Sequence, residues 1–392
     1  MTTDVRDAAV TLGQGTGPLR GIKVVEIAGI GPGPHACTIL ADLGADVIRV
    51  DRPGGNPLGG GPHDLLTRGR PSVALDLKHP DAVATVLDLV ERADVLVEGM
   101  RPGVLERLGL GPEDCLARNP RLVYGRMTGW GQDGPLAHAA GHDLTYIATT
   151  GTLHGLGQDP ARPHFPVNLL GDFGGGSTYL VIGVLAALLE ARVSGRGQVV
   201  DAAIVDGTAH LGVMAAGFAG AGLFTENRGT NLLDGGAPFY DVYETGDGRH
   251  VAVGAIEPQF FDAFVTLLGV KDVCPGQYEF ARWGEMRELF ATSLKQRTQA
   301  EWTEVFEGTD ACVAPVVTPS EAARHPHLVA RGTFVEKDGF TQPAPAPRFS
   351  RTAATLGPPP AAEAGAQTVA ALTAWGIDGV EALVASGAAV QP

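Results

Sequence analysis

Residues 21–126 alternate between short apolar runs and amphipathic segments. Each apolar run is bounded by glycine, proline or charged residues, which predicts buried strands at residues 23–28, 46–50, 73–77, 94–98 and 121–126. The segments between them have helical spacing, which predicts helices at residues 35–43, 80–93 and 111–118. Strands that alternate with helices favour a parallel sheet with helices on both faces, so we expect an α/β fold.

Two later patterns differ from this alternation. Residues 179–189 form the longest apolar run, which Glu190 ends before the ~20 residues that a bilayer span needs, so we expect a buried helix. Alternating runs at 239–244 and 250–254 flank a turn and predict a β-hairpin in an α+β unit. Further helical patterns lie at residues 258–268, 283–294, 299–306 and 366–385.

The length of 392 residues exceeds one small domain. We predict a flexible tail, a large domain, a linker, a small α+β domain and a C-terminal return to the large domain. The predicted bounds are residues 1–17, 18–205, 206–229, 230–325 and 326–392.

The formal charge of −15 argues against nucleic acid and anionic membrane surfaces as general partners. Cys37, Cys115, Cys274 and Cys312 include no CxxC pair, and the histidines form no cluster at metal-ligand spacing. We therefore expect reduced thiols and no metal site. The polar segment 1–18 lacks the apolar centre of a signal peptide, so we expect a cytoplasmic protein.

The turn after the first strand imitates a dinucleotide fingerprint, because Gly29 and Gly31 precede a helix and Asp51 closes the next strand. Pro34 stands where the third glycine belongs, and Pro32 lacks the backbone N–H that a pyrophosphate needs. These two prolines argue against a nicotinamide or flavin site.

An imidazole and a carboxylate occupy two glycine-flanked turns, at His142 and Asp172. Such a pair, placed on opposite sides of a carbon acid, can remove a proton from one face and deliver one to the other. The three glycines after Asp172 leave the backbone bare at a predicted helix start, where N–H groups can stabilise an enolate oxygen. This combination is the chemistry of a racemase.

Each of these residues also has a structural interpretation. Asp172 precedes a predicted helix, where an aspartate that accepts backbone N–H bonds as an N-cap has a lowered pKa. His142 by itself fits a structural histidine, and Glu257 fits a solvated acid at a helix start.

Six arginines follow predicted strands or glycine-rich loops, where ligands bind in open α/β sheets. They either converge on phosphate groups or are ordinary solvated residues, and their spacing leaves both interpretations open. They are Arg49, Arg52, Arg68, Arg70, Arg101 and Arg107.

An ordered set of motifs makes the pattern specific. They lie at residues 31–34, 41–47, 98–103, 127–132, 141–143, 171–176, 233–238 and 254–260. With these motifs the chain resembles the α-methylacyl-CoA racemases, within the family III (CaiB/BaiF-like) CoA-transferases, from about residue 18 to residue 392. The resemblance implies a Rossmann-like large domain with an inserted smaller α+β domain. It also implies an interlocked homodimer, with each active site shared between the two chains.

The resemblance also implies roles for single residues. His142 and Asp172 match the catalytic acid/base pair, and Glu257 matches an acid that hydrogen-bonds the catalytic histidine from the partner chain. Positions that contact CoA are matched by Arg52, Arg101 and Arg107. Because CoA is part of the substrate, no separate cofactor is expected.

The implied activity is that of an isomerase that interconverts (R)- and (S)-2-methylacyl-CoA thioesters by 1,1-proton transfer through an enolate. The alternative is a CoA-transferase that forms an acyl or CoA adduct on Asp172, which also matches the aspartate of the transferases. His142 favours the racemase, because the transferases resembled here do not generally carry Gly-His-Asp at this point. A non-catalytic acyl-CoA-binding protein is less consistent with the complete set of acid/base residues. Branched fatty acyl, sterol side-chain and arylpropionyl substrates all stay open.

Overall fold

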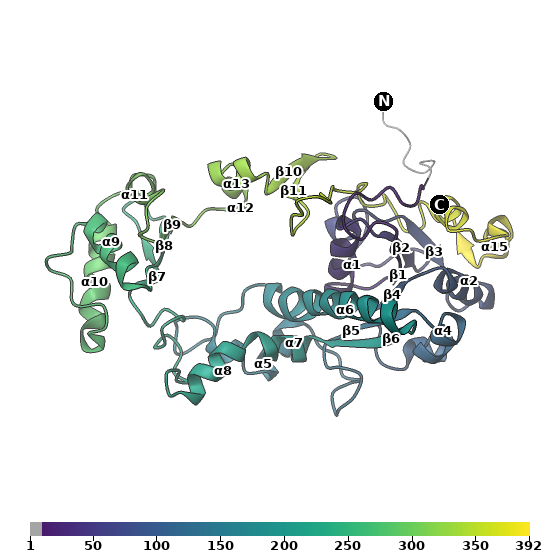
Figure 1. Ribbon diagram of the computed structural model, residues 1–392, viewed down its shortest axis with the longest axis horizontal. Helices are drawn as coiled ribbons and strands as arrows, with labels where there is room; N and C mark the ends of the chain where they lie inside the picture. The colour runs from purple at the N-terminus through teal and green to yellow at the C-terminus, as the bar shows by residue number, and fades with distance from the viewer. Residues whose placement is uncertain (1–9) are drawn as a thin grey trace. The chain divides into compact units, whose positions relative to one another are not determined.

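The computed structural model describes residues 10–392, which form two compact units (Figure 1). Unit 1 contains residues 10–150, 166–211 and 334–392, and unit 2 contains residues 151–165 and 212–333. The predicted tail partly falls outside the described residues, at 1–9. Residues 10–17 lie on unit 1, where the Gly13 N–H donates to the Asp46 carboxylate at 2.8 Å.

Unit 1 is built on a seven-stranded sheet in the order β12-β3-β2-β1-β4-β5-β6. Strands β1 to β6 are parallel, and β12 pairs antiparallel with β3. This confirms the parallel sheet expected from the apolar runs. The strands are β1 (Lys23–Ile27), β2 (Asp46–Asp51), β3 (Ser72–Leu75), β4 (Val95–Glu98), β5 (Val123–Thr128), β6 (Gln198–Ala203) and β12 (Ala389–Val390).

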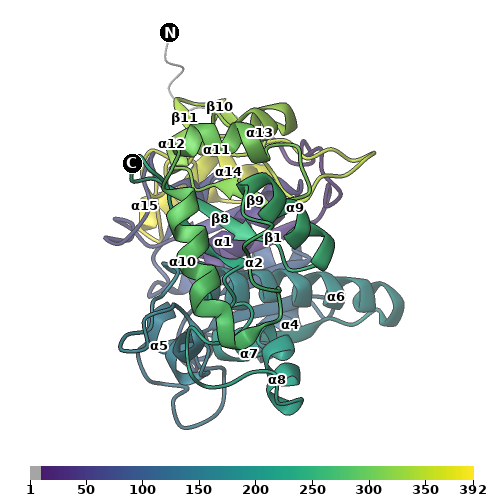
Figure 2. The same ribbon diagram turned by 90° about the vertical axis from the view of Figure 1, so that its left-hand side faces the viewer.

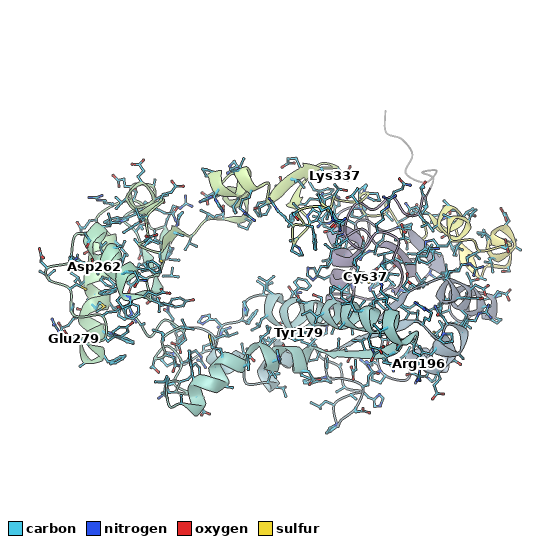
Figure 3. All side chains as sticks on the ribbon, viewed as in Figure 1. Cys37, Tyr179, Arg196, Asp262, Glu279 and Lys337 are labelled. Carbon is cyan, nitrogen blue, oxygen red and sulfur yellow. The ribbon has the colours of Figure 1, made fainter. Side chains whose placement is uncertain are left out.

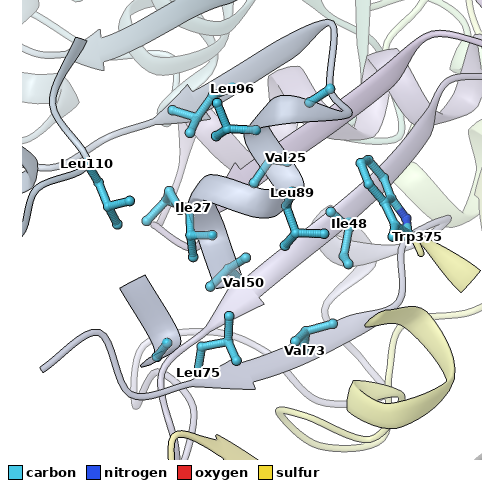
Figure 4. Close-up of a cluster of buried hydrophobic side chains, with 14 of the residues drawn as sticks. Val25, Ile27, Ile48, Val50, Val73, Leu75, Leu89, Leu96, Leu110 and Trp375 are labelled. Carbon is cyan, nitrogen blue, oxygen red and sulfur yellow. The ribbon is translucent and has the colours of Figure 1, made fainter. Parts of the chain in front are cut away.

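Helices cover both faces of this sheet, because successive strand residues point to opposite sides. In β1, Val25 packs in a cluster with α2, α4 and α14 (Figure 4). Val24, in contrast, packs with α1 and α6. The helices of unit 1 are α1 (Pro32–Asp42), α2 (Pro80–Glu91), α3 (Val104–Arg107), α4 (Pro112–Arg118), α5 (Asp143–Thr149), α6 (Thr178–Ser194), α7 (Ile204–Leu211), α14 (Thr368–Ala374) and α15 (Val380–Ser386).

Helix α1 begins three residues earlier than expected from the sequence. Pro32 and Pro34 fall in its first turn, where the missing proline N–H groups have no helical partner to lose. Cys37, labelled in Figure 3, lies on this helix and is buried. It is a free thiol, as are the other three cysteines.

The apolar run predicted as a buried helix is buried on one side only. Leu180, Val184 and Ala187 of α6 are buried, but Leu189 is 64% and Val193 is 90% exposed in the single chain. A π-helical segment, η4 (Leu169–Ser177), precedes α6 without interruption. By length and composition alone, the combined helix Leu169–Ser194 is long and apolar enough to cross a membrane, a test that core helices of soluble proteins also pass.

Unit 2 contains a three-stranded antiparallel sheet in the order β7-β8-β9, against which α10 and α11 lie (Figure 2). The predicted hairpin is confirmed as β7 (Tyr240–Glu244) and β8 (His250–Gly254), whereas β9 (Val313–Pro315) was not expected. The helices are α8 (Val213–Gly220), α9 (Pro258–Leu268), α10 (Trp283–Leu294), α11 (Gln299–Phe306), α12 (Pro319–Ala322) and α13 (Pro326–Arg331). Three of these, α9 to α11, have the predicted bounds.

The C-terminal part of unit 1 differs most from expectation. Residues 334–343 form a hairpin, β10 (Phe334–Lys337) and β11 (Phe340–Pro343). The helix expected at 366–385 is two helices, since Gly376 and Gly379 between them take positive φ angles of 78° and 69°. Residues 151–165 belong to unit 2, whereas the sequence prediction placed them in the large domain.

Candidate active site

A pocket with a volume of about 340 Å³ opens in unit 1 beyond the carboxyl ends of β1, β4 and β5. The strand order reverses between β1 and β4, which is where ligands bind in doubly wound sheets. Gly31, Arg101, Trp130, His142 and Asp172 are among the residues that line it. The structure thus brings His142 and Asp172 to one cavity.

His142 directly precedes α5, and its backbone is held by a local hydrogen-bond pair. The His142 N–H donates to the Thr145 hydroxyl at 3.0 Å, and that hydroxyl donates to the His142 carbonyl at 2.7 Å. The capping interaction fixes the main chain, while His142 remains exposed at the pocket.

Asp172 lies inside η4 rather than at a helix start. Its Oδ2 accepts a hydrogen bond from Asn168 Nδ2 at 3.1 Å, and its backbone N–H donates to Asp143 Oδ1 at 2.7 Å. Within residues 10–392 no backbone N–H bonds to this carboxylate. The N-cap interpretation of Asp172 is therefore wrong, because the helix already runs through position 172.

The electrostatic environment of Asp172 also contradicts the N-cap interpretation. Burial raises the pKa of its carboxyl above the ordinary value. The hydrogen bond from Asn168 acts in the opposite direction, the charge of Asp143 raises the pKa further, and His142 lowers it. A carboxyl with a raised pKa keeps its proton nearer to neutral pH, as a general acid must.

Gly31 allows the start of α1 to approach the Asp172 carboxylate. Its φ angle of 65° is in the left-handed region that glycine tolerates. A Cβ atom at this position would lie 3.2 Å from Asp172 Oδ2. The glycine that imitated a dinucleotide fingerprint therefore has a role in the packing of the pocket.

The three glycines after Asp172 do not begin a helix, contrary to expectation. Gly174, Gly175 and Gly176 lie inside η4, where backbone N–H groups bond to carbonyls five residues earlier. They therefore do not present free N–H donors to an enolate oxygen.

Three of the six arginines are neither phosphate ligands nor solvated surface residues, the two interpretations that the sequence left open. Arg49, Arg68 and Arg70 are buried and paired inside unit 1. Arg49 pairs with Glu26 and lies 3.2 Å from Asp51, and Arg70 Nε lies 3.3 Å from Glu26 Oε2. Arg68 pairs with Asp42 at 2.5 Å. These guanidinium groups are structural.

The other three arginines are exposed, and one lines the pocket. Arg101 follows β4 at the pocket wall, on a loop held by Glu98, whose Oε2 accepts the Met100 N–H at 2.7 Å. Arg52 follows β2, with its Nε 2.5 Å from the Gly55 carbonyl oxygen, and Arg107 ends α3. Neither Arg52 nor Arg107 is among the lining residues of this pocket.

Glu257 belongs to unit 2, where it is exposed and directly precedes α9. It lies near Cys312, whose thiol pKa is raised by burial and then by the charge of Glu257. Within the single chain, therefore, the six predicted site residues divide between two units.

Sequence reasoning missed two polar side chains that hold Asp172, namely Asn168 and Asp143. Asn168 stands four residues before Asp172, a spacing at which helical side chains meet, but the helix was expected to begin later. The contact of Asp143 with the Asp172 amide spans 29 residues and has no local signal.

Arg49→Ala is expected to lower the thermal stability, whereas Arg101→Ala is expected to weaken ligand binding. Removing Arg49 takes away one of the two guanidinium partners of the buried Glu26 and the ion-pair partner of Asp51, so the melting temperature should fall on the order of 10 °C, from a cost of about 3–5 kcal/mol. The family resemblance assigns Arg101 a contact with CoA. On that assignment, removing this exposed residue should leave the melting temperature unchanged and weaken CoA binding about 10- to 100-fold, through a lost charge-assisted bond. Thermal unfolding and CoA titration measure both; unchanged CoA affinity in Arg101→Ala would remove this residue from the CoA site.

Comparison with known proteins agrees with this architecture. The sequence profile of CoA-transferase family III matches residues 19–368, and the chain belongs to this family. Its relatives include the α-methylacyl-CoA racemase of Mus musculus, which is 44% identical over 367 residues, covering 93% of this chain and 95% of the relative. The α-methylacyl-CoA racemase of Homo sapiens is 45% identical over 333 residues, covering 83% and 86%.

Among solved structures, a CAIB/BAIF family protein from Brucella suis matches with a TM-score of 0.78 at 26% identity. The match covers 92% of this chain and 99% of that one. The resemblance inferred from the motifs is thus confirmed, and the family implies an enzyme that acts on acyl-CoA substrates.

Proposed function

We propose that the protein is a racemase that interconverts (R)- and (S)-2-methylacyl-CoA thioesters. The observation that carries this proposal is that His142 and Asp172 line one pocket at the reversal point of the sheet. An imidazole and a carboxyl in this arrangement are suited to a proton exchange at C2.

In the proposed reaction, neutral His142 takes the C2 proton from the (S) isomer and leaves a planar enolate. Protonated Asp172 then delivers its own proton to the opposite face, which gives the (R) isomer, an imidazolium and a carboxylate. The reverse reaction restores the first state, so the active enzyme carries one proton shared by the pair. The positive end of α1, which opens onto the pocket, supports the developing enolate charge.

The proposal assigns the CoA portion of the substrate to Arg52, Arg101 and Arg107. All three are exposed, and none has a carboxylate partner among the ion pairs of the described residues. Because the CoA thioester itself acidifies C2, the reaction needs no separate cofactor. This assignment accords with the absence of a complete dinucleotide fingerprint.

The proposed functional form is an interlocked homodimer in which the partner subunit's Glu257 hydrogen-bonds His142. The exposed apolar side of α6, including Leu189 and Val193, supports a protein partner, because large exposed apolar patches are costly in a monomer. The four free cysteines accord with the cytoplasmic location that the proposal retains.

The test is to incubate the purified protein with an (S)-2-methylacyl-CoA in deuterated water and to follow the C2 proton by NMR. Loss of that proton together with formation of the (R) isomer is the expected result. The mass in solution is measured on the same preparation, because the dimer requires twice 40.6 kDa. No exchange by a protein that still binds CoA would contradict the racemase.

CoA transfer is the second candidate, because the matching profile is that of a transferase family and Asp172 faces the pocket. In that reaction the Asp172 carboxylate attacks the thioester carbonyl and displaces the CoA thiolate, which gives a mixed anhydride on the protein. The two candidates thus differ in whether Asp172 forms a covalent bond.

A further inference from the structure

Asp143 is a buried carboxylate at the first turn of α5, next to His142 in the chain. It is 5% exposed, and its Oδ1 accepts the Asp172 N–H at 2.7 Å. Its other oxygen, Oδ2, is buried without a hydrogen-bond partner among the described residues. One hydrogen bond from a backbone N–H does not offset the free-energy cost of burying a charged carboxylate. The position of Asp143 is therefore not explained by stability alone.

The packing around Asp143 is close on the side of Asp172. A Cβ atom at position 171 would lie 2.4 Å from Asp143 Oδ1, so only Gly171 admits the carboxylate. A favourable interaction with the start of α5 explains an acid at this position but not a contact 29 residues away. The contact joins the first turn of α5, which directly follows His142, to η4, which carries Asp172.

We propose, building on the function proposed above, that Asp143 is a positioning residue that sets the separation of His142 and Asp172 across the pocket. Asp143 directly follows His142 in the chain, and its side chain accepts a hydrogen bond from the backbone N–H of Asp172. One residue therefore ties the two proton-transfer groups together, and its unpaired oxygen places a negative charge beside Asp172.

That charge has a second consequence, because it favours the protonated form of Asp172. The other polar groups around Asp172 are Asn168 directly before η4, His142 directly before α5, Tyr146 on α5, Glu98 at the end of β4 and Arg101 after that strand. Helix α1 contributes Gly31 at Asp172 and the ring of His35 at Phe173.

The test compares Asp143→Asn, Asp143→Ala and the control Asp94→Asn. Asparagine keeps an oxygen for the Asp172 amide but removes the charge, so the pKa of Asp172 should fall. The form that acts on the (R) isomer has carboxylate Asp172 and imidazolium His142, and it arises when the doubly protonated pair loses the proton of Asp172. The acidic limb of kcat/KM measured with the (R) isomer should therefore move to lower pH. Alanine also removes the tether, and a displaced carboxyl should cost about 100-fold in kcat/KM.

Like Asp143, the control residue Asp94 accepts a hydrogen bond from one distant backbone N–H, that of Lys23 at 2.8 Å, but it lies at the opposite end of the sheet. Asp94→Asn should leave the pH profile unchanged, and thermal unfolding of all three variants separates folding from positioning. The Asp172 carboxyl can be titrated by carbon-13 NMR, and its signal is identified because it is missing from the spectrum of Asp172→Asn. This titration provides a readout that does not depend on turnover.

The outcomes separate this inference from the proposed function. A pKa of Asp172 that does not fall in Asp143→Asn overturns the charge role, whatever the wild-type activity. An unchanged kcat/KM in a folded Asp143→Ala overturns the positioning role. A wild-type protein that exchanges no proton, together with a lowered Asp172 pKa in Asp143→Asn, contradicts the racemase and supports the inference.

Discussion

Replacing His142 by alanine is expected to lower racemisation at least about 1000-fold, because one of the two faces of C2 then has no acid/base group. CoA affinity should be unchanged, since the imidazole is assigned no contact with CoA. The structure supports this expectation by placing the exposed His142 side chain at the pocket with its backbone fixed by Thr145. The measurement is C2 proton exchange and inversion, followed from each isomer separately.

The His142→Ala variant should also keep some residual exchange activity, which depends on the isomer supplied. Because Asp172 is assigned to the (R) face, the (R) isomer should still exchange C2 hydrogen with deuterated water slowly, with its configuration kept. His138→Ala is the matched control, as it removes an exposed imidazole from the same loop that is not a lining residue of the pocket. Unchanged inversion by His142→Ala would exclude this residue as a proton carrier.

The sheet of unit 1 could be predicted from the sequence because its strands are short apolar runs that alternate with helices. Periodicity carries this information locally, as Val24 and Val25 show by packing on opposite faces. The edge strand β12 could not be found in this way, because its two residues pair with β3 only after the chain has returned. Such a pairing has no local pattern.

The site was less predictable than the sheet. Proximity of His142 and Asp172 followed from the family resemblance, whereas the π-helical segment around Asp172 did not follow from any pattern in the residues. The glycine triplet indicated a helix start, yet the helix runs through it. The buried state of Arg49 likewise depends on Glu26, 23 positions away, so spacing alone left it among the candidate phosphate ligands.

Replacing Asp172 by asparagine is the change that best separates the two candidate functions. The amide keeps the size of the side chain and an oxygen for Asn168, but it cannot donate an acidic proton or attack a thioester. For a racemase, inversion should fall at least about 1000-fold while the (S) isomer still exchanges its C2 hydrogen through His142 with configuration kept. Exchange with retention is therefore the mirror image of the result expected for His142→Ala.

A CoA-transferase makes the opposite prediction for the same residue. Wild-type protein incubated with an acyl-CoA should then carry a covalent adduct, seen as a mass increase on the peptide that contains Asp172, and Asp172→Asn should lose it. Asp201→Asn is the control, because burial also raises the pKa of Asp201, which is not a lining residue of the pocket. An adduct-free wild type with one-sided exchange in both variants leaves proton transfer between His142 and Asp172 as the chemistry of this pocket.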